Sequence, residues 1–161
     1  MKKLSIALLL VSVIAVVPAF ANSSSTEIIA QIGNIATITT ALPTQKTIDV
    51  TSSSTDIGTM TIQSSTTGTW NVTLHSAYGG FMKGDTYSEH YAYTVTLKIT
   101  SPTTVTLLDA ASLGSDKTGS YTGSGTFNLS LTANYTPAAS LSPLLSPDTY
   151  RDTITITVTA S

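Results

Sequence analysis

The stretch that decides the fold is PDTYRDTITITVTAS, residues 147–161, which ends in strict alternation of apolar and polar residues. Ile154, Ile156, Val158 and Ala160 are separated by threonines. Because successive side chains of an extended strand point to opposite faces, this pattern predicts a β-strand with one apolar and one polar face. A strand at the end of a chain needs a neighbour, since an unpaired edge exposes a row of backbone hydrogen-bonding groups.

The same alternation recurs through residues 41–161, where short apolar–polar runs are separated by turn-forming segments. Spacing of roughly 8–12 residues between turns is typical of a sandwich of short strands. Long connections before Phe127 and before Tyr150 favour Greek-key topology over a simple meander. The sequence therefore predicts an all-β, immunoglobulin-like Greek-key β-sandwich of about seven to nine strands. Its expected strands have apolar positions at Ile48, Val50, Ile57, Met60, Ile62, Trp70, Val72, Leu74, Tyr91, Tyr93, Val95, Leu97, Ile99, Phe127, Leu129, Leu131 and Ala133.

Two connections in this region have a predicted form. The runs on either side of Gly68 resemble a β-hairpin joined by the turn TTGT, residues 66–69. Residues 109–125 contain many serines, threonines and glycines, and this composition predicts a long polar connection.

Residues 1–21, MKKLSIALLLVSVIAVVPAFA, have the organisation of a secretory signal peptide. Lys2 and Lys3 precede an apolar run, and Ala19 and Ala21 fit an A-x-A cleavage site. The apolar run is shorter than the ~20 residues that a membrane span needs, so we expect cleavage and no transmembrane span in the mature chain. Residues 22–40 then form an N-terminal arm. Its register slips at Gly33, so it is either one bent strand or two short ones.

Composition excludes several classes of protein. The chain has no cysteine, which rules out disulfides, thiolate metal sites and thiol nucleophiles. Its formal net charge is −2, and loss of Lys2 and Lys3 with the signal peptide would leave −4. A sparsely charged, mildly acidic surface does not favour nucleic acid, which requires basic patches.

We find no catalytic motif, no metal-binding pattern and no cofactor motif, so we predict that the protein is not an enzyme. His75 and His90 each fall on the polar side of an expected strand, without a second ligand at metal-binding spacing. The nine carboxylates are scattered, and no G-x-S-x-G motif accompanies the many serines. Asp85 and Glu89 are expected to be solvated loop charges, and Asp148 and Asp152 to form a turn.

Three aromatic residues in the loop around Gly79 and Gly80 are candidates for ligand contact: Tyr78, Phe81 and Tyr87. Exposed rings with polar neighbours are frequent in carbohydrate sites, but such rings also pack over one end of a sandwich. The sequence favours the packing role and leaves the ligand role open.

The two ends of the chain together resemble those of a chaperone–usher pilin subunit. The features that carry the resemblance are the arm EIIAQIGNIATITT (residues 27–40), the cysteine-free sandwich of threonine-rich strands, and the ending SPDTYRDTITITVTAS. In lacking cysteine, the chain resembles the alpha-fimbrial branch of these pilins. Its last strand resembles that of the spore-coat-U-like branch. Two positions differ from the usual pilin ending: Asp148 stands in place of glycine, and Ala160 in place of an aromatic residue.

The resemblance implies polymerisation by strand addition, in which one subunit's arm completes the sandwich of the next. Expected donor-strand residues are Ile28, Ala30, Ile32, Ile35 and Ile38, and expected acceptor-groove residues are Ile154, Ile156 and Val158. Implied partners are other pilin subunits, a periplasmic chaperone and an outer-membrane usher. Implied localisation is export to the periplasm and then assembly into a fimbria at the cell surface.

The alternative is a monomeric secreted β-sandwich that binds a carbohydrate or another surface ligand. In that case the first segment pairs within its own chain, and Tyr78, Phe81 and Tyr87 form the site. A secreted hydrolase has no supporting motif.

Overall fold

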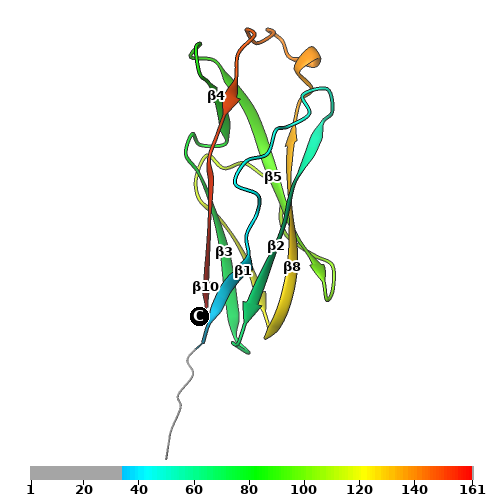
Figure 1. Cartoon of the computed structure of the whole chain (residues 1–161), viewed down its shortest axis with the longest axis vertical. Helices are drawn as coiled ribbons and strands as arrows, with labels where there is room; N and C mark the ends of the chain where they lie inside the picture. The colour runs from blue at the N-terminus through cyan, green and yellow to red at the C-terminus, as the bar shows by residue number, and fades with distance from the viewer. Residues whose placement is uncertain (1–33, 161) are drawn as a thin grey trace, which may run out of the picture. The chain divides into compact units, whose positions relative to one another are not determined.

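The computed structural model describes residues 34–160 of the 161-residue chain. These residues form an immunoglobulin-like β-sandwich, which confirms the predicted fold class (Figure 1). The strands are β1 (Ala36–Thr40), β2 (Ser54–Ser64), β3 (Thr69–Ser76), β4 (Phe81–Gly84), β5 (His90–Ser101), β6 (Val105–Ala111), β7 (Lys117–Thr122), β8 (Gly125–Tyr135), β9 (Tyr150–Arg151) and β10 (Ile154–Ala160).

Two antiparallel sheets make up the sandwich. The larger sheet has the order β1-β2-β8-β5-β4-β9, with β6 also paired to β5. The smaller sheet has the order β10-β3-β7. In this smaller sheet β3 is central, so among the residues that the structure describes β10 and β7 each have one strand neighbour and one open edge.

The core consists of the side chains that the apolar–polar alternation of the sequence predicts to face inward. Trp70, Val72 and Leu74 of β3 are fully buried, and the inward residues of β5 and β8 are also buried in the core. Trp70 packs against Phe127, with ring centroids 5.1 Å apart, and its Nε1–H donates to the carbonyl of Gly123. Both sheets therefore meet on one continuous apolar layer.

Three details differ from the sequence prediction. The strands flanking Gly68 do not form a hairpin, because β2 belongs to the larger sheet and β3 to the smaller one. Residues 41–53 form no strand, so the expected strand at Ile48 and Val50 is absent. The predicted polar connection of residues 109–125 contains the edge strand β7. The described residues thus contain ten strands, more than the seven to nine expected.

The two long sides of the sandwich are closed to different extents. On one side β6 lies close to β7, where Gly119 faces Leu107 so tightly that a Cβ atom on Gly119 would lie 2.7 Å from the Leu107 Cβ. On the other side β1 lies close to β10 without pairing to it, and β1 ends at Thr40. Beyond Thr40 the chain is irregular up to β2, and the core is open along this part of β10.

Leu129 and Leu144 offer a matched test of the core assignment. Leu129 is fully buried, whereas the side chain of Leu144 is 67% exposed. Leu129→Ala should lower the free energy of unfolding by about 2–5 kcal/mol, because it removes buried methyl groups and leaves a cavity. Leu144→Ala should change it by less than about 0.5 kcal/mol. Urea denaturation measures both, and equal effects would contradict the burial described above.

Candidate functional site

A groove of about 660 Å³ opens into the core beside the first half of β10. Ile154 and Ile156 form one wall, and the irregular segment 41–50 forms the other. The floor consists of core side chains from β2, β4, β5 and β8: Ile57, Met60, Met82, Tyr91, Tyr93, Leu131 and Ala133. The groove is therefore lined mainly by apolar side chains from both sheets.

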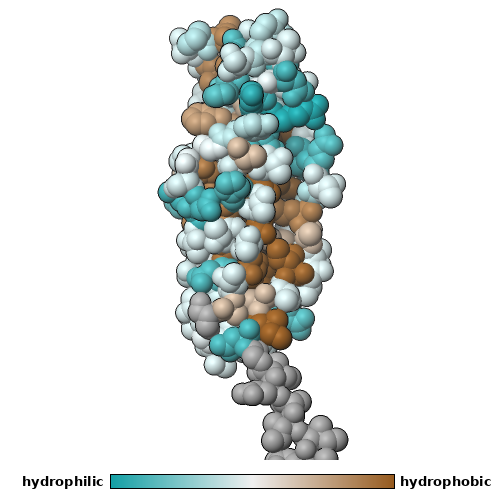
Figure 2. Space-filling model, turned by 90° about the vertical axis from the view of Figure 1, so that its left-hand side faces the viewer, coloured by the Kyte–Doolittle hydropathy of each residue, from teal (hydrophilic) through white to brown (hydrophobic). Residues whose placement is uncertain are grey.

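Figure 2 shows the side of the molecule that carries β10. Brown apolar surface gathers along the middle of this side, with white and teal polar surface on both flanks. Most of the surface is rich in threonine and serine, so an exposed apolar band of this kind indicates a surface suited to contact with another chain.

The strand β10 supplies its groove wall through the alternation seen in the sequence. Ile154, Ile156 and Val158 face the core and are half-buried, while Thr155 and Thr157 face solvent. Equivalent inward residues of β3 and β8 are fully buried. Val158 packs against the core but is not among the groove-lining residues. The inward face of β10 thus has the alternation of a core strand but is less completely buried.

The opposite wall, segment 41–50, packs on the core through its side chains. Leu42 and Ile48 contact the core cluster. Pro43 lies against Gly58, where a Cβ atom would approach the proline Cδ to 2.8 Å. Gly58 has a φ of +143° and follows the register shift of β2, so glycine suits both the bulge and the close approach of Pro43. Periodicity does not reveal this wall, because the segment forms no strand.

Two carboxylates organise the loops at the polar end of the groove. Asp148 accepts hydrogen bonds from the N–H groups of Tyr87 (2.9 Å), Thr86 (2.8 Å) and Thr149 (2.8 Å). Hydrogen bonds from these N–H groups hold the pKa of Asp148 below its usual range, and the N–H of Tyr87 has the largest effect. Glu89 accepts hydrogen bonds from Ser146 and from the Tyr150 hydroxyl, and the N–H of Ser146 contributes most to lowering its pKa. Asp148 therefore does not form the expected turn: Tyr150 and Arg151 are in β9, and the carboxylate binds the N–H groups of the distant loop at Thr86 and Tyr87. Glu89 is a bonded residue and not simply a solvated charge.

The expected donor-strand residues fall into two groups. Ile28, Ala30 and Ile32 lie outside the described residues. Ile38 lies in β1, where it is opposite Ile62 of β2, and the carbonyl of Ile35 accepts a hydrogen bond from the N–H of Ser65. Residues 35–40 are thus engaged within their own chain.

The three aromatic candidates do not line a common pocket. Tyr78 and Tyr87 are each 49% exposed, and Phe81 is 40% exposed. Phe81 packs on His90 with ring centroids 5.6 Å apart, and Lys83 Nζ lies 5.8 Å from the Tyr78 ring centroid. Phe81 lines a shallow depression of about 420 Å³, which neither tyrosine reaches.

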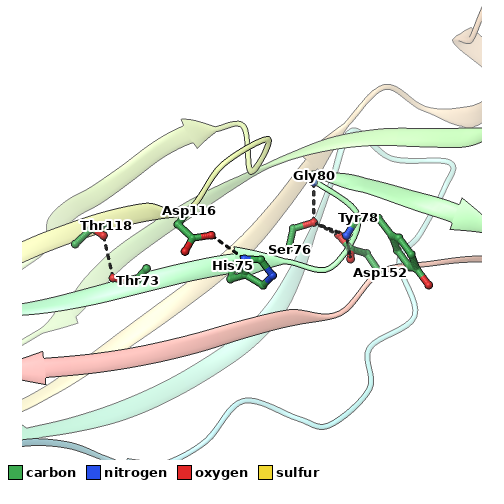
Figure 3. Close-up of polar contacts among 8 residues, drawn as sticks. All are labelled: Thr73, His75, Ser76, Tyr78, Gly80, Asp116, Thr118 and Asp152. Atoms are coloured by element: carbon green, nitrogen blue, oxygen red, sulfur yellow. Dashed lines mark hydrogen bonds and ion pairs between the residues drawn. The ribbon is translucent and has the colours of Figure 1, made fainter.

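Serine, histidine and aspartate side chains come near one another without forming a catalytic arrangement (Figure 3). His75 Nδ1 lies 2.7 Å from Asp116 Oδ1, and both side chains are exposed. The neighbouring Ser76 is on the opposite face of β3, where its hydroxyl donates to Asp152. Because the histidine lies on the other face of β3 and does not reach the serine, these side chains do not form a Ser–His–Asp triad. Within residues 34–160, no group of three His, Cys, Asp or Glu could hold a metal ion, and no helix is long and apolar enough to span a membrane.

Comparison with known proteins gives similar solved structures and no family. No family model and no curated protein sequence matches the chain. A solved chain that is similar comes from the crystal structure of the CsuC–CsuE chaperone–tip adhesion subunit pre-assembly complex of the archaic chaperone–usher Csu pili of Acinetobacter baumannii. The TM-score is 0.46 and the identity 18%, and the match covers 79% of this chain and 40% of that chain. This chain therefore spans less than half of the matched chain, and the similarity assigns no function.

The hydrogen bonds to Asp148 predict a pH-dependent contribution to stability. Because its pKa is lowered in the folded state, this carboxylate stabilises the protein above the unfolded pKa of about 4, and the contribution is lost as pH falls through the folded pKa. Asp148→Asn should therefore lower the thermal midpoint at pH 7, and its difference from wild type should shrink toward pH 2. Asp109→Asn, on exposed β6, is the control. An equal deficit at both pH values would contradict this role.

Proposed function

We propose that the chain is a non-enzymatic structural subunit of a surface fibre, in which residues 27–32 of one copy fill the groove of the next. One observation carries this proposal: β10 has an apolar inward face that is half-buried and an outer edge without a strand neighbour among residues 34–160. An added strand would complete both the burial and the backbone pairing.

The sheet order supports a missing strand at this edge. Immunoglobulin constant-type sandwiches have sheets of strands ABED and CFG. The order β1-β2-β8-β5 corresponds to ABED, and β3 followed by β10 corresponds to C and F. The place of strand G, beside F, is the open edge of β10. An occupant in that place would also cover the groove-lining residues Ile154 and Ile156.

The arm has the length and pattern to be that occupant. Residues 22–33 precede the described sandwich, and at about 3.3 Å per residue they reach about 40 Å when extended. The seven residues of β10 span about 23 Å on the same scale. Ile28, Ala30 and Ile32 would present one apolar face to the groove, and residues 33–35 would link the arm to β1 of its own subunit.

The ends of the sandwich favour a head-to-tail arrangement. Ala36 of β1 lies opposite Ser64, and Ala160 of β10 lies opposite Trp70, so both are at the end with the β2–β3 turn (Figure 1). The polar end of the groove, at Thr149–Thr153, is at the other end of β10. An arm that starts at one end of a subunit and binds at the opposite end of the next gives a contact that does not close, and this builds a fibre.

The resemblance to chaperone–usher pilins extends the proposal to other partners. A periplasmic chaperone would occupy the groove before assembly, and an outer-membrane usher would exchange it for the next subunit's arm. The protein would then pass through the periplasm to the cell surface.

The alternative is a monomer in which residues 27–32 occupy the groove of their own chain. The pairing of β1 with β2 within the chain fits this alternative for residues 36–40 only. The two possibilities differ in oligomeric state, which makes them separable by experiment.

Assembly should depend on an inward residue of β10 and not on its outward neighbour. Ile156→Lys places a charge in the groove and should abolish fibres seen by electron microscopy, as should deletion of residues 22–33. Thr157→Lys faces solvent and should assemble as wild type. Circular dichroism should show folded protein for each variant. Wild-type fibres from the arm-deleted chain would contradict the proposal.

A further inference from the structure

The chain changes sheet between β9 and β10, and a single side chain occupies the corner. β9 pairs with β4 in the larger sheet, whereas β10 pairs with β3 in the smaller one. Asp152 and Thr153 are the two residues between them. Asp152 also lines the groove, so the corner lies directly above the wall made by Ile154 and Ile156.

The Asp152 carboxylate accepts four hydrogen bonds from three parts of the chain. One oxygen, Oδ2, accepts from Ser76 Oγ (2.5 Å) at the end of β3 and from the Tyr93 hydroxyl (2.5 Å) on β5. The other, Oδ1, accepts from the N–H groups of Thr153 (2.7 Å) and Tyr78 (3.2 Å). The carboxylate thus connects the start of β10 to both sheets and to the turn after β3.

The partners of Asp152 are themselves fixed. Ser76 and Tyr93 are 5% and 6% exposed, and the Ser76 hydroxyl accepts the N–H of Gly80 at 2.7 Å (Figure 3). Gly80 has a φ of +81° and packs against buried Leu113, where a Cβ atom would lie 3.0 Å from the leucine N. Burial, and then the hydrogen bond to Asp152, raise the pKa of Tyr93 well above its usual value, so this tyrosine remains a hydrogen-bond donor.

We infer that Asp152 is a positioning residue for the groove: it holds the start of β10 so that the wall is in place before any strand binds. This inference rests on the proposed function, because it takes the groove to be a strand-binding site. The need for such a residue follows from the topology. A central strand such as β8 is held by a neighbour on each side, whereas β10 pairs with β3 alone in the described part of the chain. A wall held in advance reduces the ordering cost of binding.

The test compares Asp152→Asn with Asp116→Asn in the secreted full chain. Asp116 is an exposed carboxylate bonded to His75, the residue next to Ser76 at the same end of β3 but on the outward face, so its substitution is a matched control. Two milder variants separate the links: Ser76→Ala removes the contact to β3, and Tyr93→Phe removes the contact to β5. The first measurement is amide hydrogen exchange of the free protein at a concentration where it is monomeric. The second is fluorescence anisotropy with a labelled peptide of residues 27–34.

Asp152→Asn should speed the exchange of β10 amides about tenfold or more relative to those of β8, and should weaken peptide binding by a similar factor. Ser76→Ala and Tyr93→Phe should each give a smaller increase in β10 exchange and a smaller loss of peptide binding. Asp116→Asn should change neither. If Asp152 only stabilises the fold as a whole, Asp152→Asn should speed amide exchange equally in β10 and β8. That result would overturn the inference, and so would unchanged exchange in β10. If the wild-type protein fails to bind the peptide, the proposed function is contradicted, while the exchange measurement still decides whether Asp152 holds β10.

Discussion

The open edge of β10 is the constraint on which the rest of the structure depends. A β-strand needs partners for its backbone groups and cover for its apolar face, and within residues 34–160 β10 has a backbone partner on one side only. Its isoleucines are half-buried, whereas the apolar inward residues of the neighbouring strand β3 are fully buried. The groove and the corner at Asp152 both lie along this one strand.

The two sides of the sandwich show how the same chain can be closed in one place and open in another. Between β6 and β7 a glycine permits direct contact with Leu107, and no space remains for a further strand. Beside β10 the corresponding space is bordered by segment 41–50, which packs through Leu42 and Ile48 and forms no strand. Side-chain packing without a backbone ladder covers part of the core and leaves a cavity of about 660 Å³.

Periodicity predicted the parts of the fold that depend on burial. The inward residues of β3, β5 and β8 alternate over long runs, and all of them are in the core. Other features depend on interactions that alternation does not record. The strand β7 has a glycine and a tyrosine on its inner face, so its pattern resembles a loop. The TTGT turn at residues 66–69 joins two sheets, although its composition suits a hairpin equally well. Asp152 was expected to form a turn, but its links to Ser76 and Tyr93 join residues far apart in the sequence and could not be inferred from spacing.

The most direct measurement is disulfide cross-linking, since the chain has no cysteine of its own. One population would carry Ala30→Cys and another Ile156→Cys, and the two would be mixed, allowed to assemble and oxidised. The account predicts a cross-link between the two populations, because the arm of one copy lies in the groove of another. If mixing gives no cross-link, but a single chain with both substitutions closes on itself as a monomer, the groove is filled by its own arm and the account is wrong.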